Sequence, residues 1–147
     1  MKFDHPEIVI INKNKVYDSL GCKMNDAIKN YSKYELIAVW EDDDIYLPNN
    51  LHMRVKYLQD KQASQITHTF FFKRGKMGTY LANSIFYGQI IFTKKIFEDV
   101  GGYPEIYQAH DVKFIMNIPK EVRIRNKITN PNKITYIYRM QNIGKKI

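Results

Sequence analysis

Short apolar runs alternate with polar segments along the chain and divide it into predicted strands and helices. Two runs rich in aliphatic residues, 8–11 and 36–40, are typical of buried strands. Between them, apolar residues recur at helical spacing and predict a short helix over residues 25–31. The first third of the chain therefore has a strand–helix–strand pattern.

Pro48 predicts the start of a helix whose apolar face carries Leu51, Val55 and Leu58. Beyond it, Thr93 is a predicted N-cap and Gly101 a predicted helix end. We expect later strands over 65–72, 85–92, 122–128 and 135–138, a turn over 73–78, and helices over 94–100 and 111–117. This order predicts an α/β fold with a mixed, mainly parallel central sheet, in a single domain over residues 1–147.

Composition agrees with one soluble globular domain. The 147 residues are 44% hydrophobic and 26% charged, close to the globular average. One cysteine, Cys22, excludes an internal disulfide framework and a cysteine-rich zinc site. No apolar run reaches the ~18 residues of a membrane span, and residues 1–7 are polar where a signal peptide would be apolar. We expect a cytoplasmic protein, soluble or peripherally membrane-associated, with no transmembrane segment.

The formal net charge is +8. A basic balance is compatible with nucleic acid, anionic membranes or phosphorylated substrates. The joint abundance of Lys, Ile, Asn and Tyr explains it equally well as a compositional bias. Because the basic residues are scattered and form no long run, we predict no nucleic-acid partner.

Four adjacent carboxylates, Glu41, Asp42, Asp43 and Asp44, directly follow the predicted strand 36–40. Neighbouring carboxylates repel one another unless a cation or water relieves them. The carboxyl end of a strand is where open α/β sheets bind ligands, and oxygen ligands suit Mg²⁺ or Mn²⁺. The alternative is a solvated acidic turn that favours the dipole of the helix starting at Pro48.

Several segments together resemble family 2 glycosyltransferases, which have the GT-A (nucleotide-diphospho-sugar transferase) fold. Residues 38–48, followed by Leu51, resemble the strand, DxD motif and helix of that family. His110-Asp111 falls where the family has a Glu-Asp pair. Further matches are the Gly and Asn segment 20–28, the Gly-Gly-aromatic turn within 92–103, and the closing strand and loop within 136–142.

The resemblance implies transfer of a sugar from a nucleotide-diphosphate donor, a UDP-sugar, to a hydroxyl of a glycan or protein acceptor. It implies Mn²⁺ or Mg²⁺ held by Asp43 with Glu41, and Asp111 as the general base. Substrate-binding residues are expected at Glu41, Asp42, Asp44, Trp40, Gly102 and His110.

The sequence departs from the family pattern in three places. Glu41 is one methylene longer than the usual Asp, His110 replaces a Glu, and Met140-Gln141 stands where a His is often found. Only 40 residues precede Glu41, whereas one strand–helix–strand unit takes about 30 residues. The resemblance therefore implies an abbreviated domain lacking much of the nucleotide-binding half. The alternative function is a truncated, non-catalytic relative that binds a glycan or a partner chain. A separate chain that supplies the missing half is a further expected partner.

Overall fold

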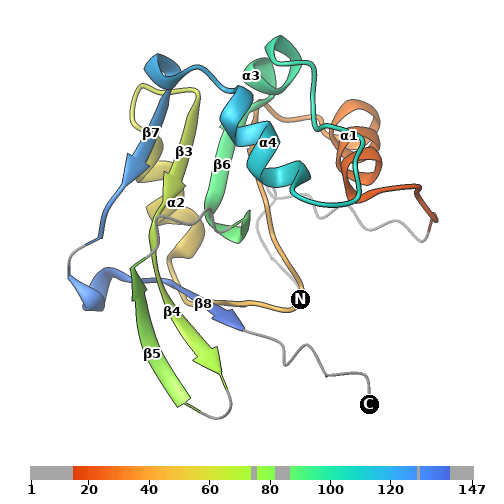
Figure 1. The fold of residues 1–147 in the computed structure, drawn as a ribbon. Coiled ribbons are helices and arrows are strands. Elements are labelled where there is room, and N and C mark those ends of the chain that lie inside the picture. Colours follow the sequence, from red (N-terminus) through yellow and green to blue (C-terminus); the bar gives the residue numbers. More distant parts are fainter. Residues whose placement is uncertain (1–14, 74–75, 82–86, 129, 140–147) are drawn as a thin grey trace, which may run out of the picture.

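Strands and helices alternate in the computed structural model, which describes residues 15–73, 76–81, 87–128 and 130–139 (Figure 1). The predicted strand 8–11 lies outside these residues. The helices are α1 (Leu20–Tyr31), α2 (Asn50–Leu58), α3 (Lys94–Asp99) and α4 (His110–Asn117), with short 3₁₀ segments at Tyr87–Gln89, Lys120–Val122 and Pro131–Lys133. The predicted α/β class is confirmed.

Two four-stranded sheets form the framework. The first has the order β1 (Leu36–Ala38), β6 (Ile90–Thr93), β3 (Ala63–Ile66), β7 (Arg123–Asn126). The second has the order β2 (Ile45–Tyr46), β8 (Tyr136–Arg139), β4 (His68–Lys73), β5 (Lys76–Leu81). Only β3–β7 and β4–β8 pair in parallel among the described strands. The prediction of a mainly parallel sheet is therefore wrong.

Two predicted strands are shorter than their apolar patterns suggest. The run 65–72 breaks at Thr67, whose N–H and hydroxyl both donate to the Asn126 carbonyl (3.0 and 3.1 Å), so that β3 and β4 enter different sheets. In the run 85–92, of which residues 87–92 are described, the 3₁₀ turn Tyr87–Gln89 precedes the strand, which begins at Ile90. A Cβ on Gly88 would lie 2.3 Å from the Tyr46 hydroxyl, so this close approach requires glycine.

The main core lies between the first sheet and helices α1, α3 and α4. Figure 1 shows these three helices gathered on one side of β6. Phe92, Phe97, Tyr103 and Phe114 are each at most 2% exposed and their rings pack together. The predicted helices at 94–100 and 111–117 are confirmed, and the Thr93 side chain accepts from the Ile96 N–H as the expected N-cap.

Helix α2 packs against β3 and β6 with a different face from the predicted one. Its buried residues are Asn50, Arg54 and Leu58, while Val55 is 45% exposed. Arg54 is fully buried, and its guanidinium donates to the carbonyls of Val39 (2.8 Å) and Ile90. The helix is rotated because this side chain reaches inward to the ends of two strands.

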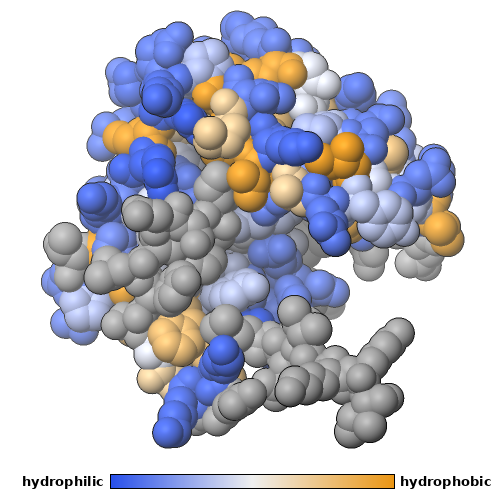
Figure 2. Space-filling view, in the orientation of Figure 1, coloured by the Kyte–Doolittle hydropathy of each residue, from blue (hydrophilic) through white to orange (hydrophobic). Residues whose placement is uncertain are grey.

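Hydrophilic residues cover much of the face in Figure 2, with separate small apolar areas between them. No helix in the described part of the chain is both long and apolar enough to cross a membrane.

We expect Arg54→Met to lower the free energy of unfolding by about 2 kcal/mol, because the Val39 carbonyl loses its buried donor. Methionine keeps the apolar stem, so the loss reports on the hydrogen bonds. Urea unfolding measures it, with Lys56→Met on the exposed side of the same helix as control. Equal stability of Arg54→Met and wild type would show that desolvating the charge cancels its hydrogen bonds.

Candidate functional site

The acidic loop, residues 41–44, connects the two sheets. It follows β1 of the first sheet, after Val39 and Trp40, and leads into β2 of the second. The predicted position beyond the carboxyl end of a strand is therefore confirmed. Helix α2 starts at Asn50, two residues beyond Pro48, so the predicted helix after the loop is also present.

Both ends of the acidic loop are held by tyrosine hydroxyls. The Tyr46 hydroxyl accepts from the Glu41 N–H (2.8 Å), and the Tyr136 hydroxyl donates to the Asp44 carboxylate. Asp44 also accepts from the Arg139 N–H (2.8 Å), and the Glu41 carboxylate accepts from the Gly88 N–H (3.1 Å). Glu41 and Asp44 thus face the protein, whereas Asp42 and Asp43 at the tip are exposed.

Burial and mutual repulsion disfavour a negative charge on both inward-facing carboxylates, Glu41 and Asp44. Burial is the main cause that raises the pKa of Glu41 from its ordinary 4.5 to about 7. The charge of Asp44, a hydrogen bond with Asp44 and the charge of Asp43 raise this pKa further, while the Gly88 N–H opposes them. Burial and the same carboxylate, Asp44, also raise the pKa of Tyr136. Glu41 therefore changes protonation near neutral pH.

The predicted metal ligands, Asp43 and Glu41, belong to no preformed group of three ligands among the described residues. Within the described residues, no three His, Cys, Asp or Glu side chains are grouped to hold a metal ion. The Glu41 carboxylate accepts a hydrogen bond from Gly88, and the Asp44 carboxylate accepts hydrogen bonds from Tyr136 and Arg139. A preformed three-ligand centre does not fit these residues. Asp42 and Asp43, at the tip of the loop, are the exposed carboxylates of the four.

The predicted base, Asp111, lies in the first turn of α4, next to His110. His110 is 7% exposed, and its ring packs against Tyr87 (5.5 Å between ring centroids) and Tyr103 (6.0 Å). Neither ring nitrogen has a hydrogen-bond partner among the residues described. Burial lowers the pKa of His110 against the opposing charge of Asp111, which favours the neutral imidazole.

Gly102, predicted to bind substrate, is buried and serves the packing of the turn before α4. Its φ is +82°, and an added Cβ would lie 2.7 Å from the Asn25 side-chain oxygen. That oxygen accepts from the Tyr103 N–H (2.7 Å), and the Asn25 amide donates to the Tyr103 carbonyl (2.9 Å). Asn25 of α1 therefore fixes the turn that leads to His110 and Asp111.

Tyr87 connects the two halves of the candidate site. Its pKa is raised well above the ordinary value by burial first and by Tyr103 next. The negative charges of Asp111 and Glu41 both raise it further. These carboxylates are seventy residues apart in the sequence yet act on one buried phenol. The Gly88 N–H beside Tyr87 also donates to Glu41 (3.1 Å), and the Tyr87 ring packs against His110 (5.5 Å between ring centroids), so this segment joins the acidic loop to the start of α4.

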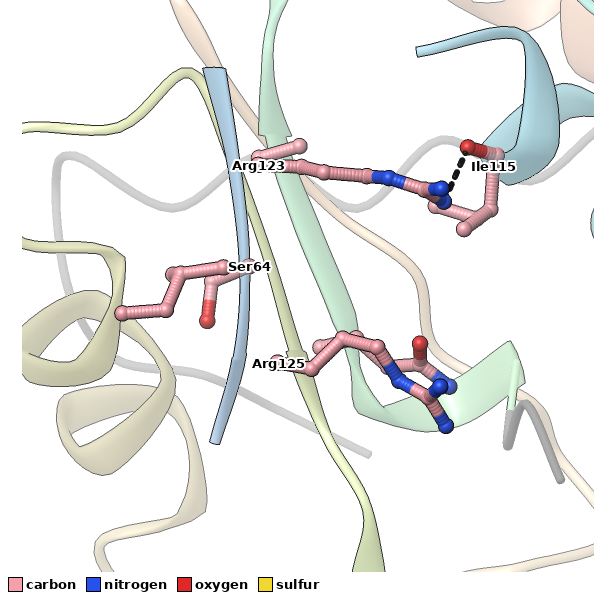
Figure 3. A pocket seen from close by; sticks show the side chains of 7 residues that line it. Ser64, Ile115, Arg123 and Arg125 are labelled. Carbon is pink, nitrogen blue, oxygen red and sulfur yellow. Dashed lines mark hydrogen bonds between the residues drawn. The ribbon is translucent and has the colours of Figure 1, made fainter. Parts of the chain in front are cut away.

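Trp40 is half-buried, with its ring stacked on Tyr46 (3.8 Å between ring centroids, 21° between planes). It lines a pocket of about 330 Å³ together with residues 46–52. This Trp40 pocket lies beside the acidic loop, since Glu41 directly follows Trp40. A second cavity, beside β7, is only about 10 Å³ and holds at most about one water. In Figure 3 Arg123 crosses beside it to the Ile115 carbonyl (2.7 Å).

Sequence reasoning did not identify the residues that support the site. Tyr46 and Tyr136 hold the acidic loop, Gly88 donates to Glu41, and the Tyr87 ring packs against His110. The tyrosines lie within short β-rich runs, where an aromatic residue is an ordinary packing residue. Gly88 alone carried a signal, because glycine within a strand pattern often marks a close backbone approach.

We expect the contribution of Glu41 to stability to fall as the pH rises from about 4.5 to about 7, since the folded state then binds more protons at Glu41 than the unfolded state does. Glu41→Gln removes this loss while keeping an oxygen for the Gly88 N–H. At pH 8 we expect it to be more stable than wild type by about 1 kcal/mol, allowing for solvent screening. Urea unfolding across this pH range measures the difference.

Asp42→Asn is the matched control, because it removes the same charge at an exposed position of the same loop. It should leave the pH dependence in place. Parallel stability curves for wild type and Glu41→Gln would contradict the assignment.

Comparison with family models and with curated proteins finds no match to this chain. The resemblance to glycosyltransferases therefore rests on the sequence segments alone, and the function is argued from the geometry of the site.

Proposed function

We propose that the protein binds a nucleotide-diphosphate sugar, of the UDP-sugar class, and transfers the sugar to an acceptor hydroxyl. One observation carries the proposal: the segment Tyr87–Gly88 contacts both elements, because the Gly88 N–H donates to Glu41 (3.1 Å) and the Tyr87 ring packs against His110, the neighbour of Asp111 (5.5 Å between ring centroids). Transfer requires a base for the acceptor and charge neutralisation for the departing diphosphate on either side of one carbon. A common region flanked by these two elements is what that chemistry needs.

Asp111 is the group proposed to take the proton of the acceptor hydroxyl. It lies in the first turn of α4, next to the buried His110. A carboxylate oxygen there accepts the proton as the hydroxyl oxygen attacks the sugar carbon. His110 beside it is buried among aromatic rings, so its proposed part is to pack the start of α4 rather than to exchange protons.

Asp43, with Asp42 beside it, is the carboxylate proposed to hold Mn²⁺ or Mg²⁺. Such ions are commonly bound by one or two carboxylates together with substrate phosphates, so an exposed pair at a loop tip suffices when the diphosphate brings the ion. The metal would neutralise the charge of the leaving diphosphate. Glu41 and Asp44 would hold the loop in place through their hydrogen bonds to Gly88 and Tyr136.

A second candidate is a non-catalytic relative that binds a glycan or a partner chain. It is favoured by the internal hydrogen bonds of Glu41 and Asp44, because these carboxylates are then not available to a metal ion. The two candidates share the fold and differ in turnover. Donor hydrolysis and sugar transfer therefore separate them, whereas binding measurements alone do not.

We expect UDP to bind weakly in the presence of Mn²⁺, with a Kd on the order of millimolar. Asp43→Asn should weaken the Mn²⁺-dependent binding about tenfold, since it removes the exposed carboxylate that faces the ion. Isothermal titration calorimetry with UDP, with and without Mn²⁺, measures both.

Asp60→Asn is the control, because Asp60 is an equally exposed carboxylate in the turn after α2. It should bind UDP and Mn²⁺ as wild type does. Equal Mn²⁺ dependence in wild type and Asp43→Asn would remove the loop as the diphosphate site.

A further inference from the structure

We propose that the β4–β5 hairpin docks on an anionic lipid membrane. The docking surface, which we call the hairpin tip, consists of Phe72 and Lys73 at the end of β4 and of Lys76 and Met77 at the start of β5. This inference goes beyond the proposed transfer reaction, because membrane docking requires neither a nucleotide donor nor a metal ion.

The hairpin leaves the body of the protein along its length. His68 and Thr69 at the start of β4 are buried, whereas Phe72 and Lys73 at its end are exposed. Figure 1 shows the hairpin extending from the second sheet, away from helices α1, α3 and α4. These helices therefore do not obstruct the approach of the hairpin tip to a flat surface.

Phe72 and Met77 form an exposed apolar pair across the hairpin. They lie directly opposite each other in the antiparallel ladder, so their side chains share one face of the sheet. Phe72 is 40% exposed and Met77 is 58% exposed. Phe70, two residues earlier on the same face, packs against a cluster of buried isoleucines. The apolar face therefore continues beyond the point where the core ends.

The opposite face of the hairpin packs by itself. Phe71 lies opposite Gly78, and a Cβ added to Gly78 would lie 2.6 Å from the Phe71 ring. The glycine therefore lets this ring cover the neighbouring strand. Because Phe71 supplies the packing across the hairpin, the exposure of Phe72 and Met77 leaves apolar area that transfer to a lipid interface would remove from water.

The charge of the hairpin tip is positive. Lys73 and Lys76 lie directly opposite each other, and like charges in this arrangement repel. The sequence has no Asp or Glu between Asp60 and Glu98 and none after Glu121, so β4, β5 and β8 carry no acidic side chain. An anionic lipid surface supplies the opposite charge, and it attracts each lysine that comes close to it.

The acidic loop meets the same sheet at a different place. It leads into β2, and the order of the sheet is β2, β8, β4, β5. Asp44 reaches β8, where its carboxylate accepts from the Arg139 N–H. Lys76 and Met77 lie two strands further on, about 10 Å away at the usual strand spacing. Physiological salt screens charges beyond about 8 Å, so the loop weakens the attraction of the hairpin tip only slightly.

The exposed apolar pair favours a membrane over a nucleic acid. Affinity for nucleic acid comes mainly from contacts of Lys and Arg with phosphates, and Met77 adds nothing to such contacts. At a membrane, apolar side chains enter the boundary between headgroups and acyl chains, while the long stems of lysines let their charges stay among the headgroups. Phe72 and Met77 suit the first part, and Lys73 and Lys76 suit the second.

Cosedimentation of the whole chain with lipid vesicles tests the proposal, in the presence of EDTA and without nucleotide. We expect binding to vesicles made of equal parts phosphatidylcholine and phosphatidylserine, and much weaker binding to phosphatidylcholine alone. Met77→Ser should weaken binding to the mixed vesicles about fivefold. The double variant Lys73→Gln, Lys76→Gln should weaken it at least about tenfold.

Met116→Ser is the matched control for Met77→Ser, because Met116 is 62% exposed on α4. The double variant Lys29→Gln, Lys113→Gln removes the same charge from exposed positions on α1 and α4. Both controls should bind vesicles as wild type does, and a thermal melt confirms the folding of each variant.

Three results would overturn the proposal. The first is no binding to the mixed vesicles, or equal binding by the hairpin variants and their controls. The second is an effect of the two lysines without an effect of Met77, which would indicate attraction by charge alone. The third is tighter binding to single-stranded poly(U) than to the mixed vesicles, with the hairpin lysines required for it.

Discussion

The buried guanidinium of Arg54 is the interaction on which the site depends most. It joins the carbonyl of Val39, just beyond β1, to that of Ile90 at the start of β6. Burial lowers its pKa to about 10, which still leaves it charged at neutral pH, and Tyr46, Tyr136 and Tyr103 surround it closely enough to oppose that decrease. One side chain of α2 thus fixes the point from which the chain enters the acidic loop.

Two tyrosines near Arg54 fix the conformation of the loop itself. Tyr46 and Tyr136 belong to the second sheet, and their hydroxyls hold Glu41 and Asp44 at the two ends of the loop. Their rings also support Trp40, directly or through each other. The same packing therefore turns two carboxylates inward, leaves Asp42 and Asp43 exposed, and forms the wall of the Trp40 pocket.

Short sequence motifs correctly predicted the features that depend on residues close together in the chain. Helix α3 begins after Thr93 and ends before Gly101, as expected, and the acidic loop follows strand β1. The sequence did not predict the face of α2, because an arginine in a helix is ordinarily exposed and Arg54 is not. Nor did it predict the division of the carboxylates, since Tyr136 lies 92 residues from its partner Asp44. Such contacts depend on how the two sheets meet, which no local pattern records.

The central claim is that the acidic loop and the start of α4 line one site. Paramagnetic line broadening tests it most directly, with the ¹⁵N-labelled protein, UDP and substoichiometric Mn²⁺. The account predicts that the amide signals of residues 41–44 broaden first and that those of Tyr87, His110 and Asp111 broaden with them. Broadening at the loop that leaves His110 and Asp111 sharp, or broadening that begins at Asp60 or Asp99, would contradict it.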